Sequence, residues 1–159
     1  MFEVIDNFLE EKEFKKIKGA ISNEYFPWFY QDTITFSTDP SDHYYFAHYF
    51  YAEHARTSEW FYLFNNFLNK IKCNGRIRIK GNLFLGQKEP RKNPSHQDYK
   101  FKHKGCLFYI NNNNGATYFK QEKVMPKENR AVFFDPSEKH SSSLCTNRKR
   151  RITINFNYI

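Results

Sequence analysis

Two histidines and one aspartate have the residue types and the spacing of a metal site. His96 and Asp98 are separated only by Gln97, and positions i and i+2 of a β-strand face the same side. On a strand, both side chains would therefore point toward one metal ion. The third ligand has to come from a neighbouring segment, and His140 is the candidate. Two imidazoles and one carboxylate form a facial triad that leaves the other coordination positions open.

An anion anchor is expected near the end of the chain. Arg151 and Thr153 share one face of a predicted strand at 151–157. The other face of this strand is apolar and should pack in the core: Ile152, Ile154 and Phe156. An inward arginine beside a hydroxyl holds a carboxylate by charge-assisted hydrogen bonds. Arg150 is the alternative anchor, and we prefer Arg151 because Thr153 is in register with it.

The elements that must position these residues are mostly strands. Alternating or apolar runs predict strands at 76–84, 106–110, 117–119, 131–134 and 151–157. Upstream, apolar residues at helical spacing predict two helices, at about 10–21 and about 57–71, and Ser58 is a candidate cap of the second. His48 lies in an aromatic run and is expected to be a core histidine. The order of elements predicts a mainly β chain with α, in which a double-sheet core carries both helices on one outer face.

The composition limits the class of protein. The 159 residues include 25 Lys+Arg against 17 Asp+Glu, which gives a formal net charge of +8. An anionic partner such as nucleic acid is one interpretation of this charge. An AT-rich coding sequence, which favours lysine, asparagine, isoleucine, phenylalanine and tyrosine, is the other. Hydrophobic residues make up 40% and aromatic residues 19% of the chain, which excludes global disorder.

The cysteines and the hydropathy pattern bear on the compartment. The three cysteines are scattered, without a C-x-x-C pair, so a disulfide framework is not expected and a reducing compartment is. No stretch approaches the roughly 20 apolar residues of a membrane span. The first residues lack the basic flank and the apolar run of a signal peptide. We therefore expect a cytoplasmic protein with no membrane partner.

The residues named so far match a known pattern. The string His96-Gln97-Asp98, then His140, then Arg151-x-Thr153 resembles the His-x-Asp…His…Arg-x-Ser/Thr pattern of Fe(II)/2-oxoglutarate-dependent oxygenases. Several segments resemble the prolyl 4-hydroxylase-like branch of that family: 107–111, 115–119, 124–126 and 129–135. In that branch a second glycine stands where this chain has Ala116. Two further segments resemble small members encoded by marine phages, namely 79–83 and 155–158.

The resemblance implies a fold and a domain layout. The fold is a double-stranded β-helix (jelly-roll) core with two helices from the N-terminal half packed on one sheet. The resemblance covers most of the chain and is specific from residue 76 onward. We therefore expect one oxygenase domain over 1–159, with 1–75 as a helical and extended support and 76–159 as the catalytic jelly-roll strands. A phage-encoded protein would act in the host cytoplasm.

The resemblance also implies a reaction and its cofactors. Fe(II) would be bound by His96, Asp98 and His140, with 2-oxoglutarate and O2 as cosubstrates. The cosubstrate-binding residues implied are Arg151, Thr153, Asn82 and Thr117. A tyrosine that often helps to hold 2-oxoglutarate in this family has no clear match, and Phe84 or Asn82 stands near its place. The implied activity is a dioxygenase that couples oxidative decarboxylation of 2-oxoglutarate to hydroxylation of an unidentified substrate, such as a peptidyl side chain, a small metabolite or a nucleobase.

The basic residues that flank the metal motif leave the substrate open. Basic residues stand on both sides of it: Lys88, Arg91 and Lys92 before it, and Lys100, Lys102, His103 and Lys104 after it. They indicate either an anionic substrate or a solvated basic rim, and we favour the rim. Tyr99 and Phe101 lie among these lysines, as in proteins that stack nucleic-acid bases, but we expect them to be core residues of a strand.

Three competing hypotheses follow from the same residues. A cupin-like metal site that uses no 2-oxoglutarate would not depend on Arg151. A basic, non-catalytic jelly-roll module that binds nucleic acid would bind more weakly at high salt and would not depend on His96 or Asp98. A nucleobase-modifying oxygenase would combine nucleic-acid binding with the metal chemistry.

Overall fold

The computed structural model describes residues 1–35 and 43–159 of the chain. The helical elements are α1 (Glu11–Ser22), the 3-10 helix η1 (Glu59–Phe64) and α2 (Asn65–Lys70). The strands are β1 (Glu3–Ile5), β2 (Phe29–Gln31), β3 (Tyr45–Ala52), β4 (Ala55–Arg56), β5 (Arg76–Leu85), β6 (Lys104–Tyr109), β7 (Thr117–Phe119), β8 (Glu122–Val124), β9 (Arg130–Phe134), β10 (His140–Ser142) and β11 (Arg150–Tyr158). No helix among the described residues is long and apolar enough to cross a membrane.

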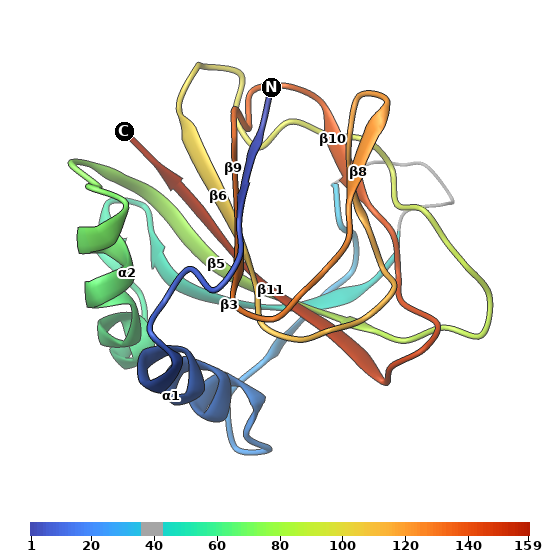
Figure 1. The fold of residues 1–159 in the computed structure, drawn as a ribbon, viewed down its shortest axis with the longest axis horizontal. Coiled ribbons are helices and arrows are strands. Elements are labelled where there is room, and N and C mark those ends of the chain that lie inside the picture. Colours follow the sequence, from blue (N-terminus) through green and yellow to red (C-terminus); the bar gives the residue numbers. More distant parts are fainter. Residues whose placement is uncertain (36–42) are drawn as a thin grey trace.

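The strands form one large and one small antiparallel sheet. Within the described residues the large sheet has eight strands in the order β1-β9-β6-β11-β5-β3-β2, with β4 paired to β3. The small sheet has the order β10-β7-β8. Figure 1 shows α1 and α2 on one side of the large sheet and the small sheet on its other side. The predicted fold class, a jelly-roll with two helices on one sheet, is confirmed.

Strand β11 lies in the middle of the large sheet, and its sequence shows what each face of the sheet contacts. It pairs with β5 on one side and with β6 on the other. Because successive side chains of a strand point to opposite faces, the apolar positions pack toward the helices: Ile152, Ile154 and Phe156. The alternate, polar positions face the small sheet: Arg151, Thr153, Asn155 and Asn157.

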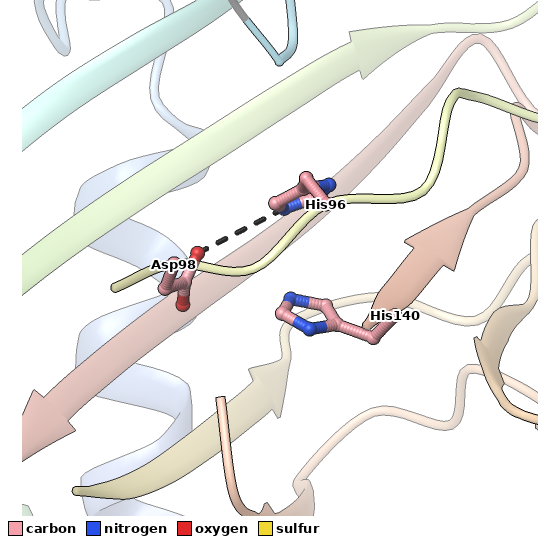
Figure 2. A group of neighbouring side chains, drawn as sticks. All are labelled: His96, Asp98 and His140. Carbon is pink, nitrogen blue, oxygen red and sulfur yellow. Dashed lines mark ion pairs between the residues drawn. The ribbon is translucent and has the colours of Figure 1, made fainter. Parts of the chain in front are cut away.

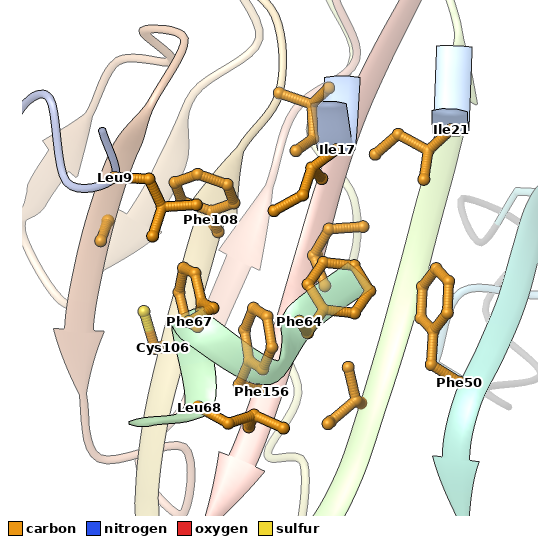
Figure 3. Packing of buried hydrophobic residues seen from close by; sticks show 14 of the residues in the cluster. Leu9, Ile17, Ile21, Phe50, Phe64, Phe67, Leu68, Cys106, Phe108 and Phe156 are labelled. Carbon is orange, nitrogen blue, oxygen red and sulfur yellow. The ribbon is translucent and has the colours of Figure 1, made fainter. Parts of the chain in front are cut away.

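The helices are held on the sheet by a core that is rich in phenylalanine (Figure 3). Helix α1 contributes Phe14, Ile17 and Ile21, which recur at helical spacing and are all buried. The ring of Phe67 in α2 stacks on that of Phe156, with the ring centroids 4.1 Å apart. Each fully buried side chain of this size stabilises the fold by roughly 1.5–3 kcal/mol.

The second helical segment shows how local sequence fixes the packing. It begins as the 3-10 turn η1 and continues as α2. The Ser58 hydroxyl caps it by accepting from the Trp60 backbone N–H. Ser58 Oγ also lies 2.7 Å from His48 Nε2, and His48 Nδ1 lies 2.7 Å from the Pro27 carbonyl oxygen. The prediction that His48 is a satisfied core histidine is confirmed, and its burial lowers its pKa.

Candidate metal and dicarboxylate site

The three predicted metal ligands converge at one point (Figure 2). One ligand atom from each of His96, Asp98 and His140 lies within 4.8 Å of the other two. His140 is the first residue of β10, and His96 and Asp98 lie in the segment between β5 and β6. His96 and His140 face each other across an isolated antiparallel bridge, in which each backbone N–H donates to the other's carbonyl at 2.9 Å.

The expectation that His96 and Asp98 lie on a strand is wrong. Among the described residues, their segment makes only isolated bridges, Lys92 to Ser143 and His96 to His140. Pro94 stands between these bridges and has no backbone N–H to donate, which prevents a continuous ladder. The two side chains nevertheless reach the same site, because the His96 bridge fixes the direction of the segment.

The two histidines are both suited to bind a metal as neutral imidazoles. His140 Nδ1 donates to the Glu138 carbonyl oxygen at 2.9 Å, because a carbonyl can only accept. This bond engages Nδ1, so Nε2 is the ring nitrogen of His140 that can bind a metal. Burial, together with the nearby His140, lowers the pKa of His96 to about 4. His96 is therefore neutral at neutral pH.

The carboxylate of Asp98 is fixed from two sides. Its Oδ2 accepts from the side-chain amides of Asn155 at 2.8 Å and Asn157 at 2.9 Å. Its Oδ1 lies 3.0 Å from an Arg78 guanidinium nitrogen and 3.8 Å from His96 Nε2. Burial alone would raise the pKa of Asp98. The charge of Arg78 and the amides outweigh burial and hold that pKa well below its ordinary value.

These donors fit a divalent transition metal. Two neutral imidazoles and an ionised carboxylate are the ligand set of non-haem iron(II) sites. Because Oδ2 accepts from two amides, Oδ1, which contacts Arg78 at 3.0 Å, is the oxygen with more room for a metal. The outer contacts of His140 and Asp98 orient both ligands, as surrounding hydrogen bonds do in known metal sites.

The predicted anion anchor lies at the other end of the same pocket. Arg151 is 1% exposed, and its Nε donates to the Gly115 carbonyl at 3.1 Å. A guanidinium N–H of Arg151 donates to Thr117 Oγ1 at 2.9 Å, and the Tyr109 hydroxyl donates to the same oxygen at 2.7 Å. A Cβ at position 115 would lie 2.7 Å from the Ser143 carbonyl oxygen and 3.0 Å from Arg151 Cδ. Only glycine therefore allows this close approach.

Arg151 carries a buried charge without an anion beside it. Within the described residues, no carboxylate lies within ion-pair distance of its guanidinium. A buried charge is costly unless it is paired, so this arginine is suited to an anionic ligand. Arg150 points to the other face of the sheet, where it donates to the Ser22 carbonyl at 3.0 Å. The structure therefore places Arg151, and not Arg150, in the pocket.

The metal ligands and the anchor line one pocket of about 150 Å³. All seven residues named from the sequence line it: Asn82, His96, Asp98, Thr117, His140, Arg151 and Thr153. The sequence analysis missed other lining residues: Tyr45, Arg78, Lys80 and Asn155. A signal for three of these was present in the strand alternation. Arg78 and Lys80 share the face of Asn82 on β5, and Asn155 shares the face of Thr153 on β11.

The residues that follow the metal motif differ from expectation. Tyr99 and Phe101 were predicted to be core residues of a strand, and this prediction is wrong. The segment forms no strand, and Phe101 is 51% exposed. The Tyr99 ring instead lies against the Arg78 guanidinium, 5.3 Å from ring centroid to guanidinium carbon. Lysines at positions 100 and 102 are exposed, which fits a solvated rim.

Solved structures share this architecture. A 2OG-Fe(II) oxygenase family oxidoreductase from Burkholderia pseudomallei has a TM-score of 0.71 at 9% identity and covers 99% of this chain and 84% of its own. A prolyl hydroxylase from Trichoplax adhaerens, solved with a peptide fragment of hypoxia inducible factor, has a TM-score of 0.68 at 13% identity, with 99% and 83% covered. The viral collagen prolyl hydroxylase of Paramecium bursaria Chlorella virus-1 has a TM-score of 0.56 at 17% identity, with 99% and 90% covered.

The comparisons bear on the fold. No protein-family model matches the chain, and no curated protein matches it. The structural likeness extends over nearly the whole chain, 99% of it in each case. The resemblance drawn from the sequence motifs is therefore confirmed at the level of architecture: the chain has the jelly-roll fold of the 2-oxoglutarate-Fe(II) oxygenases and prolyl hydroxylases.

Proposed function

We propose that this chain is an Fe(II)- and 2-oxoglutarate-dependent dioxygenase that hydroxylates a C–H bond of a second substrate. One observation carries the proposal. A pocket with the His96, Asp98 and His140 donor set at one end has a buried guanidinium without an anion, that of Arg151, at the other. A ligand with a chelating end and a carboxylate end complements both.

At the metal end, the chain's residues bind and orient the ion. His96, Asp98 and His140 would hold Fe(II), which when bound supplies the redox chemistry with O2 and 2-oxoglutarate. The hydrogen bond to Glu138 fixes the ring of His140. The two asparagine amides fix Asp98 as a ligand through Oδ1. Three protein ligands leave the remaining positions for the cosubstrates.

At the anchor end, the chain binds the far carboxylate of 2-oxoglutarate. Arg151 would form the charge-assisted hydrogen bonds, with Thr153 and Asn82 beside it on the pocket wall. Thr117 orients Arg151 and does not bind the carboxylate itself, because its hydroxyl already accepts from Arg151 and from Tyr109. Phe84 and Tyr109 cover the guanidinium with their rings. These rings exclude water and so strengthen the ionic contact.

The second substrate is proposed to be a peptidyl side chain. The support is that the structural neighbours include prolyl hydroxylases, one of them solved with a peptide. We also propose that residues 1–159 act as a single domain, since β1, β2 and β3 from the first 75 residues extend the same sheet as the later strands. The three cysteines are free thiols, which supports a reducing compartment such as the cytoplasm.

The test is turnover of 2-oxoglutarate to succinate. The wild-type chain should release succinate only with Fe(II) and O2, and Asp98→Ala should abolish this. Arg151→Met should raise the concentration of 2-oxoglutarate needed for half-maximal turnover by roughly 10–100-fold, since a charge-assisted contact is lost. The matched control is Lys16→Met, which removes an exposed charge from α1.

The competing hypotheses predict other results. A cupin-like site without 2-oxoglutarate would bind Fe(II) through His96 but give no succinate, and Arg151→Met would change nothing. A non-catalytic nucleic-acid module would bind oligonucleotides in a strongly salt-dependent way, and Asp98→Ala would not alter that binding. Either result would replace the oxygenase proposal.

A further inference from the structure

Two cations, Arg78 and Lys80, line the pocket in addition to the anchor Arg151. Both lie on β5 and face the pocket at alternate positions. In the register of the sheet, Lys80 is opposite Asn155 and Arg78 is opposite Asn157, the two residues that hold Asp98. Both cations therefore lie beside the metal end of the pocket and not beside the anchor end.

Lys80 is buried, with an exposed fraction of 8%. Its ammonium donates to the Tyr45 hydroxyl. It lies 4.8 Å from the centroid of the Tyr45 ring and 5.3 Å from that of the Tyr49 ring. Within the described residues, no carboxylate lies within ion-pair distance of it. One hydrogen bond leaves two of the three ammonium N–H groups of this lysine for a ligand.

Arg78 is only partly engaged by the protein. One of its terminal nitrogens contacts Asp98 Oδ1 at 3.0 Å and Asn157 Oδ1 at 3.1 Å. Its Nε is buried and has no hydrogen-bond partner among the described residues. An unpaired buried donor costs free energy, and a ligand oxygen in the pocket would remove that cost.

The charges of the pocket remain unbalanced when the proposed cofactors are present. The lining contains three cationic side chains, Arg78, Lys80 and Arg151, but only one carboxylate, that of Asp98. A divalent metal and the dianion of 2-oxoglutarate cancel each other. The protein's own excess of positive charge therefore remains, in a buried setting where unpaired charge is costly. A further anionic group would be needed to balance it.

The anchor for the far carboxylate of 2-oxoglutarate, Arg151, is separate from Arg78 and Lys80. Arg151 lies over the Phe84 ring, Phe84 stacks on Tyr45, and Lys80 lies over Tyr45. Arg151 and Lys80 thus contact different rings of the stacked pair Phe84 and Tyr45. Along β5, position 84, which is opposite Arg151, lies about 13 Å from Lys80 in extended backbone.

We propose that Lys80 and Arg78 form an anion subsite that binds a carboxylate or phosphate group of the primary substrate. This inference rests on the proposed oxygenase function and adds the class of its substrate. The anionic group would lie against the Lys80 ammonium and the Arg78 Nε–H, next to Asp98 and the metal. The C–H bond to be oxidised would then belong to the same side chain or small molecule as the anionic group.

The experiment separates this subsite from the 2-oxoglutarate site. The full chain is loaded with Zn(II), which supports no turnover, and saturated with N-oxalylglycine, a non-reactive analogue of 2-oxoglutarate. It is then titrated with acetate, inorganic phosphate or the neutral twin acetamide, and binding is measured by isothermal calorimetry at constant ionic strength. The variants are Lys80→Met, Lys80→Arg and the surface control Lys16→Met.

Acetate, phosphate or both should bind the wild type, and acetamide should not. Lys80→Met should weaken anion binding by about tenfold or more, Lys80→Arg should retain most of it, and Lys16→Met should match the wild type. Which of the two anions binds more tightly distinguishes a carboxylate substrate from a phosphorylated one. The affinity for N-oxalylglycine should depend on Arg151 and not on Lys80.

Three results would overturn the subsite. They are equal binding of acetamide and the anions, anion binding that survives Lys80→Met, and a loss of N-oxalylglycine affinity in Lys80→Met as large as that in Arg151→Met. Failure of the oxygenase proposal looks different, because N-oxalylglycine would then not bind the Zn(II)-loaded wild type at all.

Discussion

The two faces of β11 have different roles, one in the core and one in the pocket. On one face Ile152, Ile154 and Phe156 pack into the phenylalanine-rich core under the helices. On the other face Arg151 and Asn155 line the pocket, and the buried groups around them include donors and acceptors without partners. Burial of the residues on the first face stabilises the folded state. Residues on the second face reduce this stability, because some of their polar groups lack partners that a ligand can supply.

This contrast implies that removing an apolar side chain from one face of the large sheet and an unpaired charge from the other face should change stability in opposite directions. Removing apolar volume under the helices should destabilise the fold. Removing an unpaired charge from the pocket face should stabilise the fold while weakening ligand binding. Four substitutions, with their controls, test the contrast.

The largest effect is expected for Phe156→Ala. Phe156 is fully buried, and its ring stacks on Phe67 at 4.1 Å. Truncation should lower the free energy of unfolding by ~3–5 kcal/mol through lost transfer energy and the cavity left behind. Urea denaturation measures this. Phe29→Ala, at a position 59% exposed on the edge strand β2, is the control and should cost far less. Equal losses for both variants would contradict the assignment of the core.

Lys80→Met should give the opposite sign, with a defined pH dependence. Burial, together with the charge of Arg78, lowers the pKa of Lys80 to about 7, while the Asp98 carboxylate acts against this. Tyr45 and Tyr49 also face its ammonium from β3. The unfolded lysine keeps its proton up to its ordinary pKa of about 10.5. Below pH 7 both states are protonated, so the buried charge then destabilises the folded state by its full amount.

The metal-free Lys80→Met variant should therefore be more stable than the wild type by ~1–4 kcal/mol at pH 6. The difference should shrink between pH 7 and pH 10.5, because the wild-type lysine loses its proton in that range. Urea denaturation at a series of pH values measures it, with Lys16→Met as the control. A variant less stable than the wild type at pH 6 would show that Lys80 contributes to the fold and not to ligand binding.

A smaller effect is expected from Asn157→Leu, measured as metal affinity. Asn157 is fully buried; its amide donates to Asp98 at 2.9 Å and lies 3.1 Å from His103 Nε2. Its side-chain oxygen accepts from Arg78 at 3.1 Å. Without these contacts the carboxylate is held less firmly. Affinity for Co(II) or Zn(II) should fall by roughly 10–100-fold.

Two further variants interpret this result. Asn155→Ala removes the other amide from Asp98 but leaves the contacts of Arg78 and His103 intact, so it should weaken metal binding with less loss of stability. Asn69→Leu, at an exposed position of α2, is the control. Unchanged metal affinity in both Asn157→Leu and Asn155→Ala would show that the amides do not orient the ligand.

The smallest effect is expected at Asp6, which belongs to neither face. Asp6 follows β1 and accepts from Arg130 Nε at 2.6 Å, and Lys127 lies 2.9 Å from its other oxygen. The Arg130 hydrogen bond, with that of Lys127, lowers the pKa of Asp6 to about 2. A lowered pKa means that the ionised form stabilises the fold above pH 4, and that this contribution is lost as the pH falls from about 4 to about 2.

Asp6→Asn should therefore lower stability by only ~0.5 kcal/mol at pH 7, because the pair is partly exposed and screened. The difference from the wild type should vanish near pH 2. Thermal denaturation at several pH values measures it. A loss above ~2 kcal/mol would indicate that this edge contact is as important as the core face, which the comparison does not predict.

The sequence predicted which residues share one pocket better than it predicted the path of the chain around them. His96, Asp98, His140 and Arg151 were named from their types, their order and the family pattern that they resemble, and all four line one pocket. The strand expected under His96 is absent because Pro94 interrupts the pairing. That effect depends on a partner segment which local alternation does not reveal.

The residues that were missed share a different cause. The alternation of Arg78 and Lys80 with apolar neighbours shows that β5 has two faces, but not which one is covered by the small sheet. The contacts of Asn155 and Asn157 with Asp98 join segments far apart in sequence. Tyr99 was assigned to a core because it is aromatic, whereas its ring serves the Arg78 guanidinium. Each of these facts is set by tertiary packing.

The paired backbone hydrogen bonds between His96 and His140 have a mechanical consequence. They join the long segment between β5 and β6 to the start of β10, with the Lys92–Ser143 bridge as the neighbouring link. An ion held by Asp98 and both histidines would cross-link the same two segments a further time. Part of its binding free energy would then appear as loop-closure entropy removed from the open chain. Such an ion would also hold the two segments together, and hydrogen exchange in residues 92–98 should slow when it binds.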